Sequence, residues 1–422
     1  MKKQICIPTY NRPDAVDELL SRYCDLYREL GFDVHIFDSS DNDWTSIAVG
    51  RYAAHGGVFY HQMDSKIHSN RKVYIIYKEF IDEEADYVWV QSDSIRWNEA
   101  ALKRIVEAIE RNEYDFIIPN YRDVEAVGDQ SYEDANDFFR DCAWHMTLYG
   151  ATVLRTSVLQ YADWTNLEAK YCVDNRINFS HVGLYFELIS KMEHFKAFHI
   201  GLPEYSLTST QFKRESGWRQ DSFFIHCECW PSVISALPPV YRDKKEVIKK
   251  QGRCSGDLTT AGLKRLRAER ILNMDVYRKY CSVWKDVSDI PLGVLRLLSI
   301  TPPAIVKKPV TISRNTRRLK KRIKKFCRNY AHIYLYGCGE KGNIFAFYLE
   351  NMQISYEGFL ISKGKRDKAS LHGKPVKEMD DDILQDEQNG IVFALNELNT
   401  KQVLDSMSGK TIRAGILAED FK

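Results

Sequence analysis

Apolar and polar positions along the first 120 residues follow a pattern that predicts strands and helices in turn. Short apolar runs typical of buried strands are followed by longer segments in which apolar residues recur every three or four positions. The predicted strands are residues 3–10, 32–40, 57–63, 86–91 and 114–121, and the predicted helices are residues 13–30, 69–81 and 98–112, the last capped by Asn98. This alternation predicts a parallel sheet with helices on both faces.

The rest of the chain divides by its pattern into further regions. Residues 121–240 are less regular and rich in aromatic side chains, with a helix predicted over 180–192 and capped by Ser180. Residues 241–290 have the spacing of charged helices, and residues 331–422 repeat the strand and helix alternation on a smaller scale. We therefore expect an α/β protein in three parts: a first domain at 1–240, a helical and basic linker region at 241–330, and a small second domain at 331–422.

A basic segment without acidic residues leads into the last part. No Asp or Glu occurs from Ile290 to Gly339, and residues 307–328 are strongly basic behind an apolar stretch that prolines interrupt. One interpretation is a solvated linker helix. The alternative is a patch that binds an anionic membrane surface, because each basic residue there adds about 1 kcal/mol and an apolar flank can enter the interface. Nucleic acid is not an expected partner, since no RNA- or DNA-binding motif accompanies the charges.

Composition limits the class of protein. Of the 422 residues, 44% are hydrophobic and 28% charged, and a net charge of +2 argues against a protein that binds nucleic acid over its whole surface. The ten cysteines form no CxxC pair, which is typical of reduced thiols in a cytosolic protein. The N-terminus has the pattern of a first strand rather than a signal peptide, and no apolar run reaches about 18 residues. We expect a cytoplasmic protein, held at the inner face of the plasma membrane if residues 307–328 bind lipid.

Three segments place aspartates and small polar residues where predicted strands end. They are IPTYNRP at 7–13, IFDSSDND at 36–43 and VWVQSDS at 88–94. Ligands of parallel sheets bind at this edge. In their order and spacing the three segments resemble the nucleotide-sugar half of a family 2 glycosyltransferase of surface-polysaccharide biosynthesis. The resemblance covers about residues 1–240 and implies a domain with the GT-A fold there.

The resemblance also implies a site for a nucleotide diphosphate. By the resemblance, Thr9, Tyr10 and Arg12 would line the nucleotide pocket, and Asp38 would contact the base. An aspartate at a strand end has the acceptor oxygens that such a contact needs. The alternative is that these residues only stabilise turns, a role that aspartate often has through its own hydrogen bonds.

Asp93 would face the diphosphate and a divalent Mn or Mg ion, beside Ser92 in the same nucleotide site. The family usually has two or three acids at this motif, whereas Gln91 and Ser94 stand in the flanking positions here. One carboxylate and the diphosphate would hold the ion more weakly than two carboxylates. Lys66, Arg71 and Lys72 would share the phosphate charge, unless they belong to a solvated helix face.

Transfer of a sugar to a hydroxyl needs a general base. The family's acid lies near the start of a helix that corresponds to residues 180–192, where His181 stands in this sequence. A histidine with an ordinary pKa near 6.5 suits that role. Asp174 is the second candidate, and the alternative for His181 is a structural hydrogen bond at the start of the helix.

A glycine-rich turn opens the second domain. Gly337, Gly339 and Gly342 in YGCGEKG have the GxGxxG spacing between a strand and a helix, where backbone amides can bind phosphates. NAD is not expected, because Ser362 stands near the end of the next strand, where a ribose-binding acid would be. The unit resembles small Rossmann-like domains attached to sugar-modifying acyltransferases and methyltransferases, which favours a residual binding or assembly role.

The sequence therefore predicts a glycosyltransferase with an N-terminal GT-A domain, a helical basic linker and a small C-terminal Rossmann-like α/β domain. It would move a sugar from a nucleotide sugar to a hydroxyl of a glycan or lipid-linked glycan, with inversion, in capsule or O-antigen assembly. The alternatives are a scaffold that binds nucleotide sugars with a decayed site, and a nicotinamide-dependent sugar-modifying enzyme that uses the second domain. The sequence is compatible with a homo-oligomer.

Overall fold

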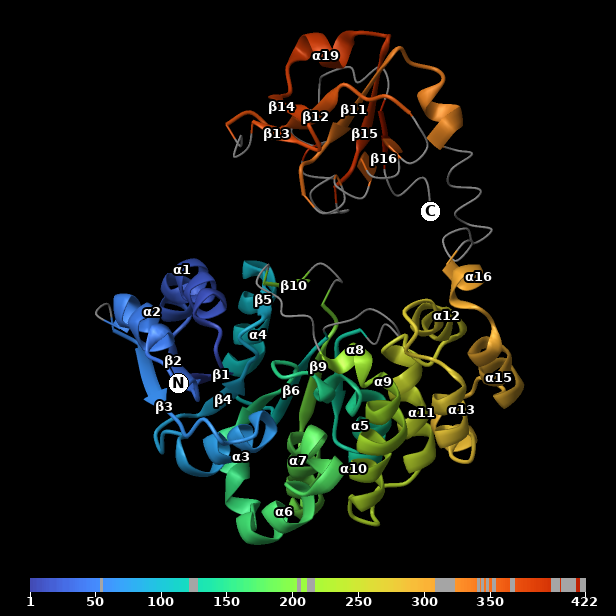
Figure 1. Cartoon of the computed structure of the whole chain (residues 1–422). Helices are drawn as coiled ribbons and strands as arrows, with labels where there is room; N and C mark the ends of the chain where they lie inside the picture. The colour runs from blue at the N-terminus through green and yellow to red at the C-terminus, as the bar shows by residue number, and fades with distance from the viewer. Residues whose placement is uncertain are drawn as a thin grey trace. The chain divides into compact units, whose positions relative to one another are not determined.

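The structure is a computed structural model of the chain, and it divides into two compact units, residues 1–307 and 308–422 (Figure 1). It describes residues 1–53, 56–120, 128–202, 206–210, 217–307, 323–339, 342, 345–346, 349–350, 354–364, 369–395, 403 and 415–417. Most of the predicted membrane patch at 307–328 lies outside these residues.

The first unit is built on an eight-stranded sheet with the order β3-β2-β1-β4-β8-β6-β9-β7. Its strands β1 to β4 run parallel, β8 is antiparallel to both of its neighbours, and β7 is antiparallel to β9. The strands are β1 (Lys3–Thr9), β2 (Phe32–Asp38), β3 (Val58–Gln62), β4 (Tyr87–Val90), β6 (Phe116–Pro119), β7 (Gln130–Tyr132), β8 (Val153–Arg155) and β9 (Ala197–Ile200).

Helices cover both faces of this sheet because successive side chains of a strand point to opposite sides. In β1, Ile5 and Ile7 belong to the core under α1 and α4, whereas Cys6 belongs to the core under α3, α5 and α7. The helices are α1 (Pro13–Glu29), α2 (Trp44–Ala53), α3 (Ser69–Glu79), α4 (Glu99–Glu110), α5 (Ala135–Cys142), α6 (Trp164–Tyr171) and α7 (Ser180–Lys191).

Two predicted helix caps have different outcomes. The Asn98 side chain accepts a hydrogen bond from the Ala101 amide at 2.8 Å, which confirms the predicted cap of α4. The predicted Ser180 cap is wrong, because Ser180 is the first residue of α7 and its N-cap is Phe179, which makes no side-chain capping bond. The helix follows directly on a 3-10 turn at Asp174–Phe179, so no extended polar residue precedes it.

Further helices complete the first unit. They include α8 (Gly217–Gln220), α9 (Ser222–Phe224), α10 (Trp230–Ala236), α11 (Lys244–Cys254), α12 (Thr260–Ala268), α13 (Met274–Tyr280), α14 (Trp284–Val287), α15 (Leu292–Ile300) and α16 (Pro303–Lys307). Val247, Leu263, Trp284 and Leu295 join the core that lies under α7. The helices predicted for 241–290 are thus present, while the predicted division at residues 240 and 330 stays a prediction.

The second unit has a six-stranded sheet of order β13-β14-β12-β11-β15-β16, in which every neighbouring pair except β13 and β14 is parallel. The elements are β11 (His332–Tyr336), β12 (Gly358–Ile361), β13 (Ser370–Leu371), β14 (Lys374–Glu378), α19 (Asp381–Gln385), β15 (Asn389–Phe393) and β16 (Gly415–Leu417). The predicted class is therefore confirmed: a large, mainly parallel α/β sheet that fits a GT-A domain, a helical region, and a small Rossmann-like sheet.

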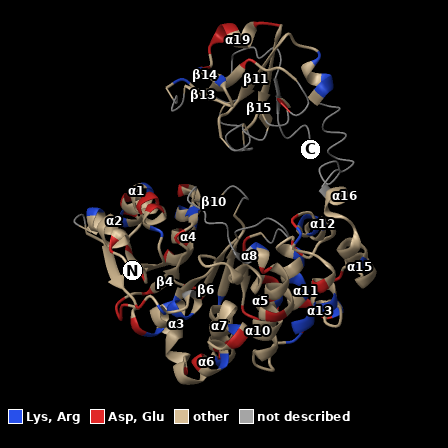
Figure 2. Cartoon of the chain, in the orientation of Figure 1, with Lys and Arg blue, Asp and Glu red and all other residues tan. Residues whose placement is uncertain are grey.

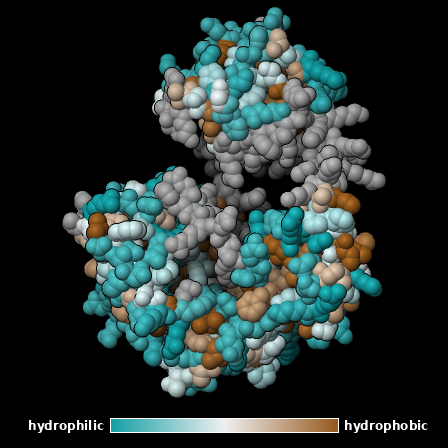
Figure 3. Space-filling view, viewed as in Figure 1, coloured by the Kyte–Doolittle hydropathy of each residue, from teal (hydrophilic) through white to brown (hydrophobic). Residues whose placement is uncertain are grey.

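Surface charge and hydropathy differ between regions. Acidic and basic residues are mixed along the helices of the first unit, as the colours of the ribbon show (Figure 2). Apolar side chains are exposed on α15 and α16, among them Leu297, Ile300 and Ile305 (Figure 3). No helix among the described residues combines the length and the apolar character needed to span a membrane.

Candidate functional site

The carboxyl ends of β1, β2 and β4 bring three predicted site residues together. Thr9 and Asp38 face each other at the ends of β1 and β2, and Asp93 follows β4, which pairs with the other side of β1. The Thr9 hydroxyl donates to Asp93 Oδ2 at 2.8 Å. Because neighbouring parallel strands end at the same edge, residues that lie 84 positions apart in the sequence are in contact.

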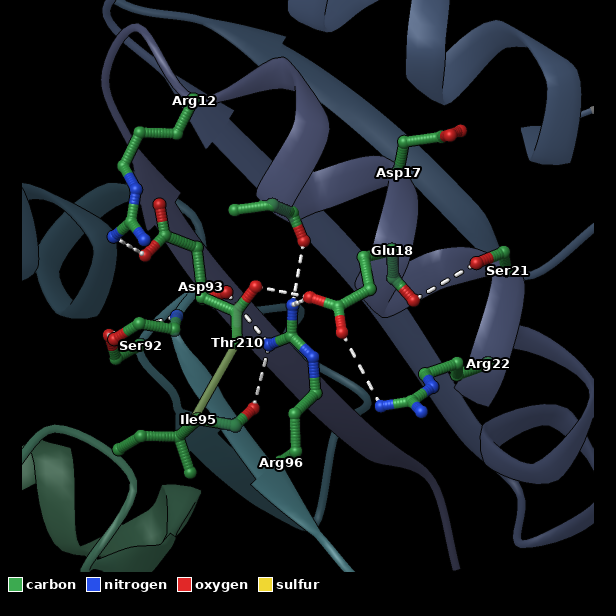
Figure 4. A network of polar contacts seen from close by, with 12 residues as sticks. Arg12, Asp17, Glu18, Ser21, Arg22, Ser92, Asp93, Ile95, Arg96 and Thr210 are labelled. Atoms are coloured by element: carbon green, nitrogen blue, oxygen red, sulfur yellow. Dashed lines mark hydrogen bonds and ion pairs between the residues drawn. The ribbon is translucent and has the colours of Figure 1, made fainter. Parts of the chain in front are cut away.

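Asp93 is the centre of this group, with only 4% of its surface exposed. Its Oδ1 accepts a hydrogen bond from a terminal nitrogen of Arg12 at 2.6 Å (Figure 4). Burial raises the pKa of Asp93, while the charge of Arg12 and the Thr9 hydroxyl act in the opposite direction. Such charge-assisted bonds are stronger than neutral ones, so the pair holds the loop after β1 against the loop after β4.

Lys72 lies under the same edge. It comes from α3, is 2% exposed, and donates to the Thr9 carbonyl and the Ser39 hydroxyl, both at 2.6 Å. Burial lowers the pKa of Lys72 to about 8, and the charges of Asp38 and Asp93 oppose that shift. The structure thus places Lys72 inside the candidate site rather than on a solvated helix face.

Asp38 is fully buried and is held by its neighbours in the chain. Its Oδ1 accepts from the Ser40 amide at 2.9 Å and from the Ser40 hydroxyl at 2.5 Å, and Oδ2 accepts from the Tyr60 hydroxyl at 3.1 Å. The Ser40 hydroxyl in turn accepts from the Asn11 amide at 2.7 Å. Sequence reasoning missed the roles of Ser40 and Tyr60, although Asp-Ser-Ser after a strand is a signal for such a turn.

The remaining predicted nucleotide-site residues lie nearer the surface. Tyr10 is 43% exposed. Ser92 is partly exposed, and its hydroxyl shares a 2.8 Å hydrogen bond with that of Ser94.

A buried arginine that the sequence analysis did not single out supports the loop of Asp93. Arg96, on β5 (Ile95–Trp97), is 1% exposed and donates to the Asp93 carbonyl at 2.8 Å and to the Ala15 carbonyl at 2.7 Å. It also pairs with Glu18 at 3.2 Å, and the Thr210 hydroxyl donates to the same carboxylate (Figure 4). Thr210 follows β10 (Leu207–Ser209), the partner strand of β5, so the network ties two sheets and α1 together.

The predicted divalent metal ion does not fit these side chains. Gln91, at one position where the resemblance places an acid, is fully buried and carries an uncharged amide in place of a carboxylate. Both Asp93 oxygens already accept hydrogen bonds, from Arg12 and from Thr9. Within the described ranges, no three or more His, Cys, Asp and Glu side chains cluster in a way that could hold a metal ion.

The two candidate bases lie in different surroundings. His181 is 1% exposed, its Nε2 lies 3.0 Å from the Met146 carbonyl, and burial lowers its pKa to about 4. Asp174 is exposed and has a positive φ of 45° at the start of a 3-10 turn. The surroundings of His181 favour a structural role. Both assignments stay predictions.

The glycine turn of the second unit is explained in part by packing. Gly337 has a φ of +113°, and a Cβ there would lie 2.6 Å from Leu395. A Cβ on Gly342 would overlap the Gly337 carbonyl oxygen, whereas one on Gly339 would enter open space. Ser362 shares a 2.8 Å hydrogen bond with the Tyr336 hydroxyl. Whether the turn binds phosphate stays a prediction.

We expect Gly342→Ala to destabilise the second unit by about 2–3 kcal/mol, because the added methyl group displaces backbone. The matched control Gly339→Ala should change stability by less than about 0.5 kcal/mol. All eight tryptophans precede residue 308, so hydrogen exchange of β11 and β12 peptides reports on this unit while tryptophan fluorescence reports on the first. Equal exchange in both variants would contradict the packing role of Gly342.

No protein-family model and no curated protein matches the sequence. Solved structures that align with the chain include S. aureus TarS 1-349, at 14% identity over 75% of this chain and 92% of that one, with a TM-score of 0.41. The mannosyltransferase PcManGT from Pyrobaculum calidifontis, in complex with GDP-Man and Mn2+, aligns at 14% identity over 73% and 81%, with a TM-score of 0.39. Glucosyl-3-phosphoglycerate synthase from Mycobacterium tuberculosis aligns at 11% identity over 56% and 80%, with a TM-score of 0.39. These alignments are too distant to carry an argument about activity.

Proposed function

We propose that the chain is a glycosyltransferase that takes its sugar from a nucleotide-diphospho-sugar. The observation that carries this proposal is the meeting of Thr9, Arg12, Asp38, Lys72 and Asp93 at the carboxyl edge of three parallel strands. Cations at this edge suit a diphosphate, and the exposed ring of Tyr10 suits a base.

In the proposed reaction an acceptor hydroxyl attacks the anomeric carbon of the donor sugar. The new bond joins the acceptor oxygen to that carbon, while the bond from the carbon to the diphosphate oxygen breaks. The electron pair stays on the leaving diphosphate, and a general base takes the hydroxyl proton. Attack on the face opposite the leaving group inverts the anomeric centre, as the sequence resemblance implies.

The acceptor that we propose is a hydroxyl of a glycan or lipid-linked glycan in surface-polysaccharide assembly. Its support is the sequence resemblance together with the exposed Leu297, Ile300 and Ile305 ahead of the basic residues 307–328. An apolar face followed by basic residues has the chemistry of a surface that binds anionic lipid.

Wild-type protein is expected to co-sediment with vesicles that contain anionic lipid, and to be released as the salt concentration rises. Replacing Leu297 and Ile300 together by serine should lower the bound fraction several-fold, because both side chains are exposed and apolar. Neutral vesicles are the control. Equal binding of wild type and double variant would contradict a contribution of α15 to lipid binding.

The experiment that tests the proposed function is calorimetry with a panel of UDP-, GDP-, CDP- and dTDP-sugars. The proposal expects one of them to bind and Asp38→Asn to weaken that binding, because the Asp38 carboxylate holds the Ser40 and Tyr60 hydroxyls at this edge. Absence of binding to every member would overturn it. Binding without transfer to any supplied glycan would favour the alternative of a scaffold with a decayed site, for which the buried Gln91 is the supporting observation. Binding of NADH would favour the nicotinamide-dependent alternative.

Binding of the nucleotide sugar is expected to weaken as the pH rises through about 8. The pKa of Lys72 is lowered to about 8 by burial, so its ammonium charge is complete below that pH and is lost above it. When Lys72 loses this charge, the negative charges of Asp38 and Asp93 are less compensated, and they repel the negatively charged diphosphate. The measurement is the dissociation constant from pH 6.5 to about 9.5, and a flat profile would contradict the role of Lys72.

A further inference from the structure

The carboxylate that the resemblance assigns to a metal ion is already paired with groups of the chain. Asp93 Oδ1 contacts a terminal nitrogen of Arg12 at 2.6 Å, and Oδ2 contacts the Thr9 hydroxyl at 2.8 Å. The Asp93 side chain is 6% exposed and the Arg12 side chain 19% exposed. A divalent cation would have to displace or crowd two short hydrogen bonds in a nearly closed space.

The charges around Asp93 also oppose the binding of a divalent metal ion. Those that act on its carboxyl come from Arg12, Arg96 and Lys72, and all three are positive. Coulomb repulsion between cations is strong in a partly buried site, where the effective dielectric constant is about 20 rather than 80. A divalent ion prefers several carboxylate or water oxygens, and the Asp93 carboxylate, which already bonds Arg12 and Thr9, does not supply them.

The neighbouring side chains do not supply the missing oxygen ligands for a divalent ion. Gln91 is fully buried and has an uncharged amide. The Ser94 hydroxyl shares a hydrogen bond with that of Ser92. Neither position offers the second carboxylate that the family's motif supplies.

We propose that this site neutralises the leaving diphosphate with its own cations and needs no divalent ion. Arg12 contacts the diphosphate, and Asp93 is a positioning residue that holds the guanidinium in place. This inference rests on the proposed function. A guanidinium has five N–H donors in a fixed plane, so it can contact a carboxylate and a phosphate from different edges. When the bond from the anomeric carbon to the diphosphate oxygen breaks, the new negative charge lies beside Arg12.

The test is titration of UDP, GDP, CDP and dTDP into the full chain, first in excess EDTA and then in excess MnCl2. The inference expects one nucleotide to bind with the same affinity in both conditions, within a factor of about three. Binding that requires MnCl2, or that is at least about tenfold tighter with it, would overturn the inference and leave the proposed function standing. No binding under either condition would remove both.

Two variants separate positioning from metal binding. Arg12→Met should weaken nucleotide binding in EDTA by about 10- to 100-fold, and Arg12→Lys should recover part of the loss because the charge remains. Asp93→Asn should weaken binding by about tenfold in EDTA, with no recovery on addition of MnCl2. Arg22→Met is the control, since Arg22 is 61% exposed and lies on α1 beside Glu18.

A metal-dependent site predicts the opposite pattern. Asp93→Asn would then abolish only the part of the affinity that depends on manganese, and Arg12→Met would free the carboxylate for the ion. Electron paramagnetic resonance of Mn2+ with the protein and nucleotide reads this directly. The inference expects the Mn2+ signal to match that of nucleotide and Mn2+ without protein. A protein-bound signal that disappears in Asp93→Asn would overturn it.

Discussion

Arg96→Met is expected to lower the free energy of unfolding by about 3–5 kcal/mol, the cost of breaking a buried ion pair from one side. Arg96 is 1% exposed and donates to the Asp93, Ile95 and Ala15 carbonyls as well as to Glu18. The substitution leaves those acceptors without their donor, and the Glu18 side chain is only 14% exposed. Unfolding in urea, followed by tryptophan fluorescence, measures the change, since Trp89 and Trp97 are buried in the adjoining core.

The matched control for Arg96 is Arg22→Met. Arg22 pairs with the same carboxylate, at 3.4 Å, but its side chain is 61% exposed. Exposed pairs contribute at most about 1 kcal/mol, so this variant should unfold close to the wild type. If Arg96→Met does not fold, the double variant Arg96→Met/Glu18→Leu should fold better, because it removes the carboxylate left without its partner. Equal stability of the two single variants would contradict the role of Arg96.

Lys72→Met is expected to weaken binding of the nucleotide sugar about 100-fold, the second large effect. Its ammonium bonds the Thr9 carbonyl and the Ser39 hydroxyl, and it compensates Asp38 and Asp93. Without the ammonium group, the carboxylates of Asp38 and Asp93 repel each other without a compensating positive charge. Each charge-assisted hydrogen bond that is lost contributes about 1.5–3 kcal/mol. The dissociation constant of the donor measures the loss.

Lys66→Met is the control for Lys72. Lys66 is exposed and lies in the loop just before α3, whereas Lys72 lies within α3. Its removal takes away one positive charge near the same edge without a buried contact, so donor affinity should change by less than about threefold. Circular dichroism of Lys72→Met checks that the fold is retained. A loss of similar size in both variants would show that general surface charge, rather than the buried Lys72, attracts the donor.

Much of the fold could be predicted from the sequence because local periodicity carries it. The strands that end in Thr9 and Asp38 have short apolar runs typical of buried strands, and the carboxyl ends of neighbouring parallel strands lie at the same edge of a sheet. The same logic predicts that Asp93 lies at the same edge as Thr9, and the two side chains share a hydrogen bond. The predicted cap at Ser180 is wrong because the 3-10 turn before α7 cannot be recognised from the spacing of apolar residues.

The side-chain contacts that hold the site in place could not be predicted in the same way. The pairing of Arg96 with Glu18 depends on β5, a strand of three residues, and on its pairing with β10. Strands this short carry almost no alternation signal. The contact between Arg12 and Asp93 is equally hidden, because the sequence shows which residues lie at an edge but not which way their side chains turn. The sequence therefore did not show the ion pair between Arg12 and Asp93, and the role of Asp93 as a metal ligand stays a prediction.

The most direct test of the proposed site is a crystal structure of the protein soaked with the nucleoside diphosphate that binds in solution. The proposed site predicts density for the nucleotide at the carboxyl ends of β1, β2 and β4, with its base beside Asp38 and its diphosphate on Arg12. Density at the glycine turn around Gly337 in the second unit, with the edge of the first sheet empty, would contradict it.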